Sequence, residues 1–256
     1  MAFDVSADAY GRFMGRFSTG LSAAFADFAG IARGARLRVL DVGCGPGILT
    51  AELVDRLGPD LVAAVDPMPT FVTHARNMLG GADIRQSPAE ELPFDDGVFD
   101  AALAQLVVQF MTDGVAGMCE MARVCHPGGT VAASLWDHRG GRGPLSPFWT
   151  AVQAIDPEVT GEAQLVTVRR EYIAELMRAA GLVDLVETEL ATRVRFDSFD
   201  EWWAPYLLGV GTAGDHVAGL DPDGVEELRE TCRRILGTGP FGIDAIAWAT
   251  RGTVAG

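Results

Sequence analysis

Lysine is absent from this chain of 256 residues, so all 20 of its basic residues are arginines. A phosphate-binding loop of the P-loop kind needs a lysine after its last glycine, which excludes kinases and nucleotide hydrolases of that type. Mechanisms that form a Schiff base on lysine, or use lysine as a base, are excluded for the same reason. One missing residue type thus removes several classes of enzyme.

Cysteine is scarce, and long apolar runs are missing. The four cysteines have neither the spacing of metal ligands nor that of a disulfide framework, so we expect thiols in a reducing compartment and no metal site. No window approaches the roughly 18 consecutive apolar residues of a membrane span. The residues near the N-terminus also lack the sustained apolar run that a secretion signal contains. These absences predict a cytoplasmic protein that is not bound to a membrane.

Basic residues are also fewer than acidic ones. The formal net charge is −15, from 20 basic and 35 acidic residues, and binding to nucleic acid requires clustered positive charge. We therefore expect no nucleic-acid partner, while the oligomeric state stays open. An apolar content of 48% in a chain of this length is sufficient for one well-filled α/β domain.

Short apolar runs alternate with longer amphipathic segments from about residue 37, which is typical of strand-helix-strand units. This pattern predicts a doubly wound, Rossmann-like, seven-stranded and mostly parallel sheet. The expected strands are 37–42, 61–65, 82–86, 99–104, 130–136, 182–190 and 243–250. The expected helices of the core are 48–57, 70–79, 113–124 and 169–180.

We expect a single domain over residues 1–256, with two additions to its core. Residues 1–36 are predicted to form an N-terminal lid of two helices, because aromatic and apolar residues recur there at helical spacing. The core spans 37–190 and 243–256, and the long connection 191–242 is predicted to be a helical cap over the active site. Its aromatic residues either line an acceptor pocket or are simply core, and they are Trp202, Trp203 and Tyr206.

The most informative motif runs from Val39 to Thr50, where a buried strand leads into alternate glycines. Glycine has no Cβ and accepts positive φ, so this turn brings bare backbone close to a ligand. A dinucleotide fingerprint places a glycine at its sixth position, but counting from Gly43 finds Ile48 there, which disfavours NAD and FAD.

The segment Leu40–Gly47 resembles the first motif of the class I S-adenosylmethionine-dependent methyltransferases. The resemblance covers residues 37–136 and includes the segments 92–100 and 123–129. It implies S-adenosylmethionine as the cofactor, with the methionine carboxylate near the glycine turn and the start of the next helix. It also implies that Asp41 orients the turn and the amine, that Asp66 accepts the ribose hydroxyls, and that Met68 flanks the adenine.

The implied cofactor site extends to further strand ends. Pro88 stands where the family usually has an aspartate, so adenine recognition would fall to Ala89 or Glu90. Arg16 either folds over the site and pairs with the cofactor carboxylate or is a surface arginine. The complete set of expected cofactor residues is Arg16, Asp41, Gly43, Cys44, Gly45, Gly47, Asp66, Pro67, Met68, Ala89, Glu90, Ala104, Gln105 and Leu106.

Methyl transfer from a sulfonium needs no acid for its leaving group, so alignment and exclusion of water can suffice. Many members of the family have a histidine where this chain has Gln109. If a base is used, His138 and Asp137 after the fifth strand are the leading candidates, with a solvated turn as the equal alternative. Tyr10 could fold over the site or belong to the core. The expected function is methyl transfer from S-adenosylmethionine to a small, partly apolar metabolite; a non-catalytic module that binds the cofactor is the alternative.

Overall fold

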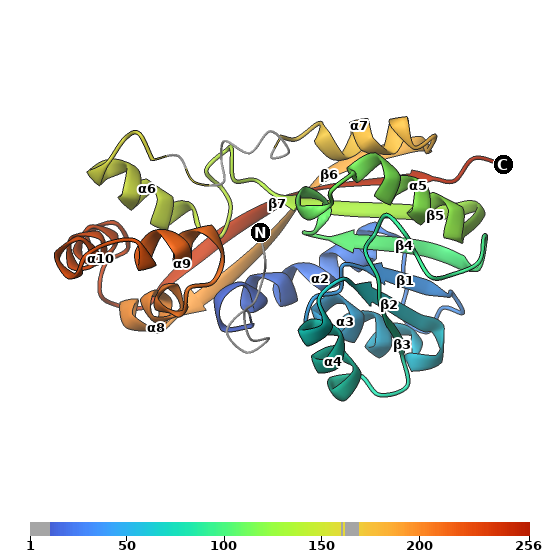
Figure 1. Cartoon of the computed structure of the whole chain (residues 1–256), viewed down its shortest axis with the longest axis horizontal. Coiled ribbons are helices and arrows are strands. Elements are labelled where there is room, and N and C mark those ends of the chain that lie inside the picture. Colours follow the sequence, from blue (N-terminus) through green and yellow to red (C-terminus); the bar gives the residue numbers. More distant parts are fainter. Residues whose placement is uncertain (1–10, 160, 162–168) are drawn as a thin grey trace.

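A seven-stranded sheet forms the centre of the described part of the chain. The computed structural model describes residues 11–159, 161 and 169–256 (Figure 1). The strand order is β3-β2-β1-β4-β5-β7-β6, and neighbours are parallel except the two pairs made by β7. This order confirms the predicted doubly wound α/β class. The strands are β1 (Val39–Val42), β2 (Val62–Asp66), β3 (Asp83–Gln86), β4 (Phe99–Gln105), β5 (Cys125–Trp136), β6 (Val183–Phe196) and β7 (Phe241–Thr253).

The carboxyl ends of β1, β2 and β4 create a position for a ligand. β1 lies between the other two, with Asp41 opposite Ala64 of β2 and Leu103 of β4. The chain runs outward from β1 to β3 and then returns to the other side of β1, so the connections after β1 and β4 diverge. Open α/β sheets bind their ligands at such a switch point.

Helices cover both faces of the sheet. On one face α5 and α7 pack over Leu40 and Ala102, and on the other α2 and α3 pack over Val39 and Leu103, with α4 beside them at Ala64. A parallel sheet covered on both faces needs apolar side chains on both. No helix in the described ranges is long and apolar enough to cross a membrane. The helices and helical turns here are α2 (Arg16–Phe28), α3 (Ile48–Leu57), η2 (Pro59–Leu61), α4 (Pro69–Met78), η3 (Val108–Phe110), α5 (Gly114–Val124) and α7 (Tyr172–Ala179).

From Gly11 to Phe28 the described part of the N-terminal segment forms one continuous run of helix, where the spacing predicts two helices. A π-helical turn, η1 (Gly11–Gly15), leads directly into α2. Gly20 lies inside α2 without interrupting it. It faces β6 at close range, because a Cβ on Gly20 would clash with Oγ1 of Thr192. The glycine therefore permits close packing of α2 on the sheet.

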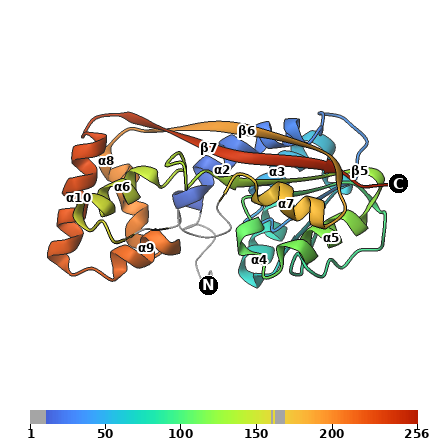
Figure 2. The ribbon, with the colours of Figure 1, turned by 90° about the horizontal axis from the view of Figure 1, so that it is seen from above.

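β6 and β7 extend well beyond the other strands and carry a second group of helices, which we call the helical end (Figure 2). The two strands remain paired as far as Phe196 and Phe241. Both strands extend beyond their predicted limits, and in the extension of β6 Val194 and Phe196 belong to the same buried apolar cluster as Phe17 of α2. The predicted cap boundary at residue 191 thus falls inside β6. The helical end comprises α6 (Ser146–Ile155), α8 (Phe199–Trp203), η5 (Ala204–Leu208), α9 (Gly211–Ala218) and α10 (Pro222–Leu236).

Helix α6 has no counterpart among the predicted elements. It packs against α10, and Phe148, Ala151 and Val152 are buried in the same apolar cluster as Trp202. The sequence does carry a signal for it, since Pro147 in the first turn is followed by apolar residues at three- and four-residue spacing. The helical end therefore combines two separate segments of the chain.

Arg56 of α3 joins that helix to α2 from a buried position. Its side chain is only 4% exposed. The guanidinium donates to the carboxylates of Asp27 (2.5 Å) and Glu52 (2.7 Å) and to the carbonyls of Ile31 (2.7 Å) and Ala23 (2.9 Å). This one side chain thus fixes how α2 lies on the core.

We expect Arg56→Met to lower the free energy of unfolding by about 3 kcal/mol, because it removes the buried guanidinium from the carbonyls of Ile31 and Ala23 and leaves Glu52 with only the longer contact to Arg33 (3.3 Å). Urea denaturation followed by circular dichroism measures the change. Arg36→Met, at an exposed position, is the matched control. Equal unfolding midpoints for the two variants would contradict the role assigned to Arg56.

Candidate functional site

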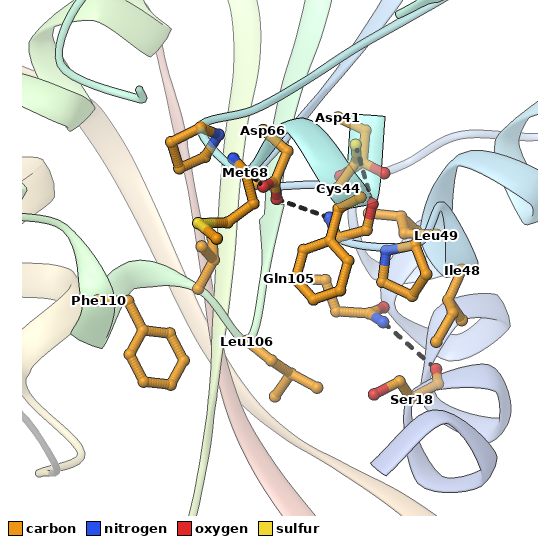
Figure 3. Close-up of a pocket in the computed structure, with 16 residues that line it drawn as sticks. Ser18, Asp41, Cys44, Ile48, Leu49, Asp66, Met68, Gln105, Leu106 and Phe110 are labelled. Atoms are coloured by element: carbon orange, nitrogen blue, oxygen red, sulfur yellow. Dashed lines mark hydrogen bonds between the residues drawn. The ribbon is translucent and has the colours of Figure 1, made fainter. Parts of the chain in front are cut away.

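A cavity opens at the carboxyl ends of β1, β2 and β4 (Figure 3). The glycine bend after β1 forms its base, and Ser18 of α2 and Phe110 of η3 lie on opposite sides of it. The residues that line this cavity are Ser18, Asp41, Gly43, Cys44, Gly45, Pro46, Ile48, Leu49, Asp66, Pro67, Met68, Phe71, Gln105, Leu106, Val107 and Phe110.

The bend itself requires glycine. Gly43 and Gly45 have φ of +73° and +53°, and the N–H groups of Gly43 and Cys44 both donate to the carbonyl of Val65 (2.8 and 2.9 Å). A Cβ on Gly43 would stand 2.4 Å from Cγ2 of Val107. Backbone conformation and lack of space thus both select glycine, and the bend exposes bare backbone to the cavity.

Asp66, at the end of β2, closes the bend from the neighbouring strand. Its Oδ2 accepts the N–H of Gly45 (2.8 Å), and its Oδ1 accepts the N–H of Met68 (2.9 Å). Burial raises the pKa of this carboxyl above its ordinary value, while the two backbone donors oppose that rise. Each carboxylate oxygen can accept more than one hydrogen bond, so Asp66 can still receive hydroxyl groups from a ligand.

Asp41, at the end of β1, is 1% exposed, and only one of its two carboxylate oxygens accepts a hydrogen bond from the described residues. Its Oδ2 accepts the hydroxyl of Thr50 (2.6 Å), whereas no described residue donates to its Oδ1. Burial raises the pKa of Asp41 to about 7, and the charge of Asp66 adds to the rise against the Thr50 hydrogen bond. A ligand cation would offset the cost of burying this carboxylate charge, so the site favours positive charge beside Asp41.

The rest of the wall is apolar. Met68 and Phe71 follow β2, and Leu106 and Phe110 follow β4. Leu106 has a left-handed backbone (φ +62°), held by the bond from its N–H to the carbonyl of Ser134 in β5 (3.0 Å). Such a conformation is uncommon for leucine and is typical of functional sites. Phe110 is 47% exposed, so an aromatic ring stands at the mouth of the cavity.

Most of the predicted cofactor residues meet in this cavity. The structure brings together Asp41, Gly43, Cys44, Gly45, Asp66, Pro67, Met68, Gln105 and Leu106. The Cys44 thiol is buried, which raises its pKa and keeps it protonated.

Gly47 and Ala104 lie outside the lining and have local roles instead. Gly47 (φ +93°) precedes α3, and a Cβ there would stand 2.9 Å from Leu79, so this glycine serves the approach of α3 to the end of α4. Ala104 is fully buried within β4. The structure shows a packing role for both residues, and their contact with the cofactor stays a prediction.

Ala89 and Glu90 likewise have local roles. The Glu90 carboxylate accepts the N–H groups of Thr112 (2.7 Å) and Asp113 (3.1 Å), and so fixes the loop before α5. Ala89 is buried in the apolar core beneath that helix. Neither residue lines the cavity, because the connection after β3 is held against α5 rather than against the glycine bend.

Arg16 points toward the helical end, contrary to the prediction that it pairs with the cofactor carboxylate. Its guanidinium donates to the carboxylate of Glu201 (2.6 Å) and to the carbonyl of Arg195 (2.5 Å), and lies 4.6 Å from the ring centre of Phe196. The correction follows from long-range packing of α2 on β6, which local sequence does not reveal.

The candidate bases are not assembled at the cavity. Asp137 is fully buried and accepts the N–H of Gly140 (2.6 Å) and Nε of Arg142 (2.6 Å), so its carboxylate holds the loop after β5. His138 lies in the same loop, against Gly143, and does not line the cavity. Tyr10 falls outside the residues that the structure describes. The structure therefore gives Asp137 a structural role in place of the predicted catalytic one.

The aromatic residues of the predicted cap form an apolar core. Trp202, Trp203 and Tyr206 are each 2–3% exposed and lie outside the cavity lining. Tyr206 stacks on Phe148 of α6 (4.6 Å between ring centres) and meets Phe13 edge-on (5.0 Å). Of the two interpretations left open by the sequence, core packing is the one that the structure shows.

Several lining residues are not identified by the sequence analysis. Pro46, Ile48 and Leu49 belong to the glycine motif itself, and their side chains could have been included with it. Phe71 and Phe110 follow strand ends at short distance, a position from which side chains reach the switch point. Ser18 gives no local signal, because only the packing of α2 brings it to the cavity.

A family model described as a methyltransferase domain matches residues 40–133, from β1 into β5. The chain carries a class I S-adenosylmethionine-dependent methyltransferase domain. Its cofactor is S-adenosylmethionine, and the glycine bend, Asp66 and Asp41 are residues of this chain suited to bind it.

Known proteins agree with this assignment. An uncharacterised methyltransferase of Mycobacterium tuberculosis is 40% identical over 105 residues, 41% of this chain and 42% of that protein. The 2-methyl-6-phytyl-1,4-hydroquinone methyltransferase 2 of Oryza sativa is 35% identical over 153 residues, 59% of this chain and 40% of that protein. Among solved structures, the YcgJ protein of Bacillus subtilis shares the fold with a TM-score of 0.55 at 18% identity, covering 94% of this chain and 99% of its own.

The shifted pKa of Asp41 predicts that cofactor binding depends on pH. Only the ionised carboxylate attracts the cofactor's ammonium group, so the affinity for S-adenosylmethionine should rise about 25-fold between about pH 5.5 and pH 7.5. Asp41→Asn should bind more weakly and lose this slope, whereas the exposed control Asp60→Asn should retain it. Titration calorimetry at several pH values measures both; equal slopes in all three proteins would contradict the role of Asp41.

In the ligand-free protein, the contribution of Asp41 to folding stability changes with pH in the opposite direction to the cofactor affinity. Between about pH 4 and pH 7 the folded Asp41 keeps a proton that the unfolded chain has released, so this group makes folding less favourable as the pH rises. The cofactor should therefore stabilise the protein more at the upper end of this range.

Proposed function

We propose that this protein transfers the methyl group of S-adenosylmethionine to a small, partly apolar metabolite. The observation that carries the proposal is the bond between the Gly45 N–H and the Asp66 carboxylate (2.8 Å). It places an acidic side chain beside a bare glycine bend at the switch point of the sheet, where a nucleoside and an amino-acid group can be bound side by side.

Different residues of the cavity would bind different parts of the cofactor. Asp66 would receive the ribose hydroxyls, Met68 and Phe71 would flank the adenine, and Asp41 would receive the ammonium group. When bound, S-adenosylmethionine supplies a methyl group already activated by its sulfonium. The protein then needs to bind, align and exclude water.

The acceptor side explains why we propose an apolar metabolite. Leu106, Val107 and the half-exposed Phe110 form the wall beyond the cofactor residues. Within the described lining, the ionisable side chains are Asp41, Cys44 and Asp66, all on the cofactor side. We therefore infer that alignment against an apolar wall, rather than a base at the mouth, makes the main contribution to the rate.

The rice relative suggests a first set of acceptors. Its name records a methylphytyl hydroquinone as its substrate, a ring compound with polar hydroxyls and a large apolar part. Such a compound suits the mouth of the cavity near Phe110. Nucleic acid is not proposed as an acceptor, because the net charge of −15 opposes phosphate binding.

Asp66→Ala tests the cofactor site directly. Loss of the charged acceptor for the ribose should weaken binding of S-adenosylhomocysteine about 30- to 100-fold. Asp60→Ala, the same change at an exposed position, should leave the affinity unchanged. Calorimetry gives both values, and thermal unfolding verifies that each variant is folded; unchanged affinity in a folded Asp66→Ala would contradict the assignment.

Turnover separates the proposed enzyme from a module that binds the cofactor without catalysis. Purified protein with S-adenosylmethionine and a panel of alkyl hydroquinones, followed by metabolite extracts, should form S-adenosylhomocysteine above the background without acceptor. Mass spectrometry of the extracts identifies the methylated product. Tight cofactor binding with no product on any member of the panel or extract would favour the module.

A further inference from the structure

Strand β6 lies at the end of the sheet, and its outer edge has no strand partner among the described residues. β6 is 14 residues long and pairs on its other side with β7, from Val183 to Phe196. Figure 2 shows these two strands running past the rest of the sheet. A long exposed edge presents N–H and C=O groups that can pair with another strand. The sheet is therefore open to extension at β6.

The two faces of β6 differ in burial. On one face Thr192, Val194 and Phe196 are buried, and Thr192 lies against α2. Side chains alternate between the faces of a strand, so the residues between these point to the other face. The exposed side chains of that other face are, in chain order, Glu187, Glu189, Ala191, Arg193 and Arg195. Two acids, one small residue and two bases thus form a single row.

This row is complementary to a reversed copy of itself. In an antiparallel pair, residues that lie opposite each other point to the same face of the sheet. With Ala191 opposite Ala191 of a second copy, each Glu189 lies opposite an Arg193 and each Glu187 opposite an Arg195. All four charges of each row then meet the opposite charge, and the small alanine side chains meet at the centre.

Other registers lose this match. Because the faces must agree, the register can change only in steps of two residues. One step in one direction places Arg195 opposite the apolar Leu185, and one step in the other places Glu187 opposite Asp197. The charge pattern therefore selects the register centred on Ala191.

We propose that this protein forms a symmetric dimer in which two copies of β6 pair antiparallel about Ala191. The partner at this edge is thus a second copy of the chain, selected by charge complementarity. The two sheets join into one continuous sheet, which leaves β6 without an exposed edge. This inference does not depend on the proposed methyl transfer.

The charged side chains of the row remain accessible within one copy. The side chains of Arg193 and Arg195 are 67% and 76% exposed. The ion pairs of Arg195 and Glu187 within the chain are long, at 3.8 and 3.9 Å. Glu189 binds Arg142 (2.9 Å), but its side chain is still 33% exposed. Ion pairs at exposed positions are weak, so side chains of a second copy can share or replace them.

One carbonyl of this edge already has a donor. The guanidinium of Arg16 donates to the carbonyl of Arg195 (2.5 Å). Arg195 lies at the end of the charged row and Ala191 at its centre. We therefore expect the paired strands to be held most firmly around Ala191.

Charge reversal tests the proposed pairing. Arg193→Glu with Arg195→Glu places acids opposite acids in a dimer, and Glu187→Arg with Glu189→Arg places bases opposite bases. Analytical ultracentrifugation at about 1–100 μM should show a dimer for the wild type and self-association at least about a hundredfold weaker for each double variant. An equal mixture of the two double variants should form a heterodimer, because each acid then faces a base.

The matched control reverses two exposed arginines away from β6. Arg36→Glu with Arg139→Glu changes the net charge by the same amount as Arg193→Glu with Arg195→Glu, and it should remain dimeric. Thermal unfolding verifies that every variant is folded.

A cysteine at the centre of the pair tests the register. Opposite residues of an antiparallel pair have Cα atoms about 4.5–5.5 Å apart, within the range of a disulfide. The background is Cys119→Ser, because Cys119 is the exposed native cysteine. Mild oxidation should link the Ala191→Cys variant into a covalent dimer, whereas the control Ala32→Cys, also at an exposed position, should stay unlinked.

Four results would overturn the inference. These are a monomeric wild type over the whole concentration range, a dimer that both double variants retain, a mixture of the folded double variants that stays monomeric, or no disulfide in Ala191→Cys. None of these measurements involves methyl transfer, so their failure would leave the proposed function intact.

Discussion

The hydrogen bond from the Gly45 N–H to the Asp66 carboxylate is the interaction on which the site depends. It joins the turn after β1 to the end of β2, two strands that are neighbours because the sheet is doubly wound. The turn can approach the carboxylate only because Gly43 and Gly45 accept positive φ and Gly43 has no Cβ to meet Val107. Sheet topology and two missing side chains therefore create the cavity together, and we propose that this cavity is the cofactor site.

In the proposed function, buried charge gives this site its selectivity for a ligand with a cationic end. Asp41 and Asp66 lie close enough in one cavity for the charge of one to raise the pKa of the other, and burial raises both. A ligand with a cationic end compensates that cost, whereas an anion at the same position would increase it. Leu106 and Phe110 line the same cavity as these acids. In the proposed function, the acids bind the polar cofactor and the apolar wall receives the acceptor.

Sequence reasoning succeeds where function is encoded locally. The motif around Gly45, the acid after β2 and the alternation of strands and helices predict the fold and most of the cavity lining. It fails for Arg16, whose partner Glu201 lies 185 residues away along the chain. It also fails for Asp137, because the sequence pattern does not show that Arg142 of the same loop binds this carboxylate. Ser18 enters the cavity only through the packing of α2, which no local pattern reports.

A crystal structure with bound S-adenosylhomocysteine tests the central claim most directly. The account predicts both ribose hydroxyls within hydrogen-bonding distance of the Asp66 carboxylate, with the ligand lying against the backbone of Gly43 and Gly45 and the bend in its present conformation. A ligand bound elsewhere, or a ribose that faces away from Asp66, would contradict it.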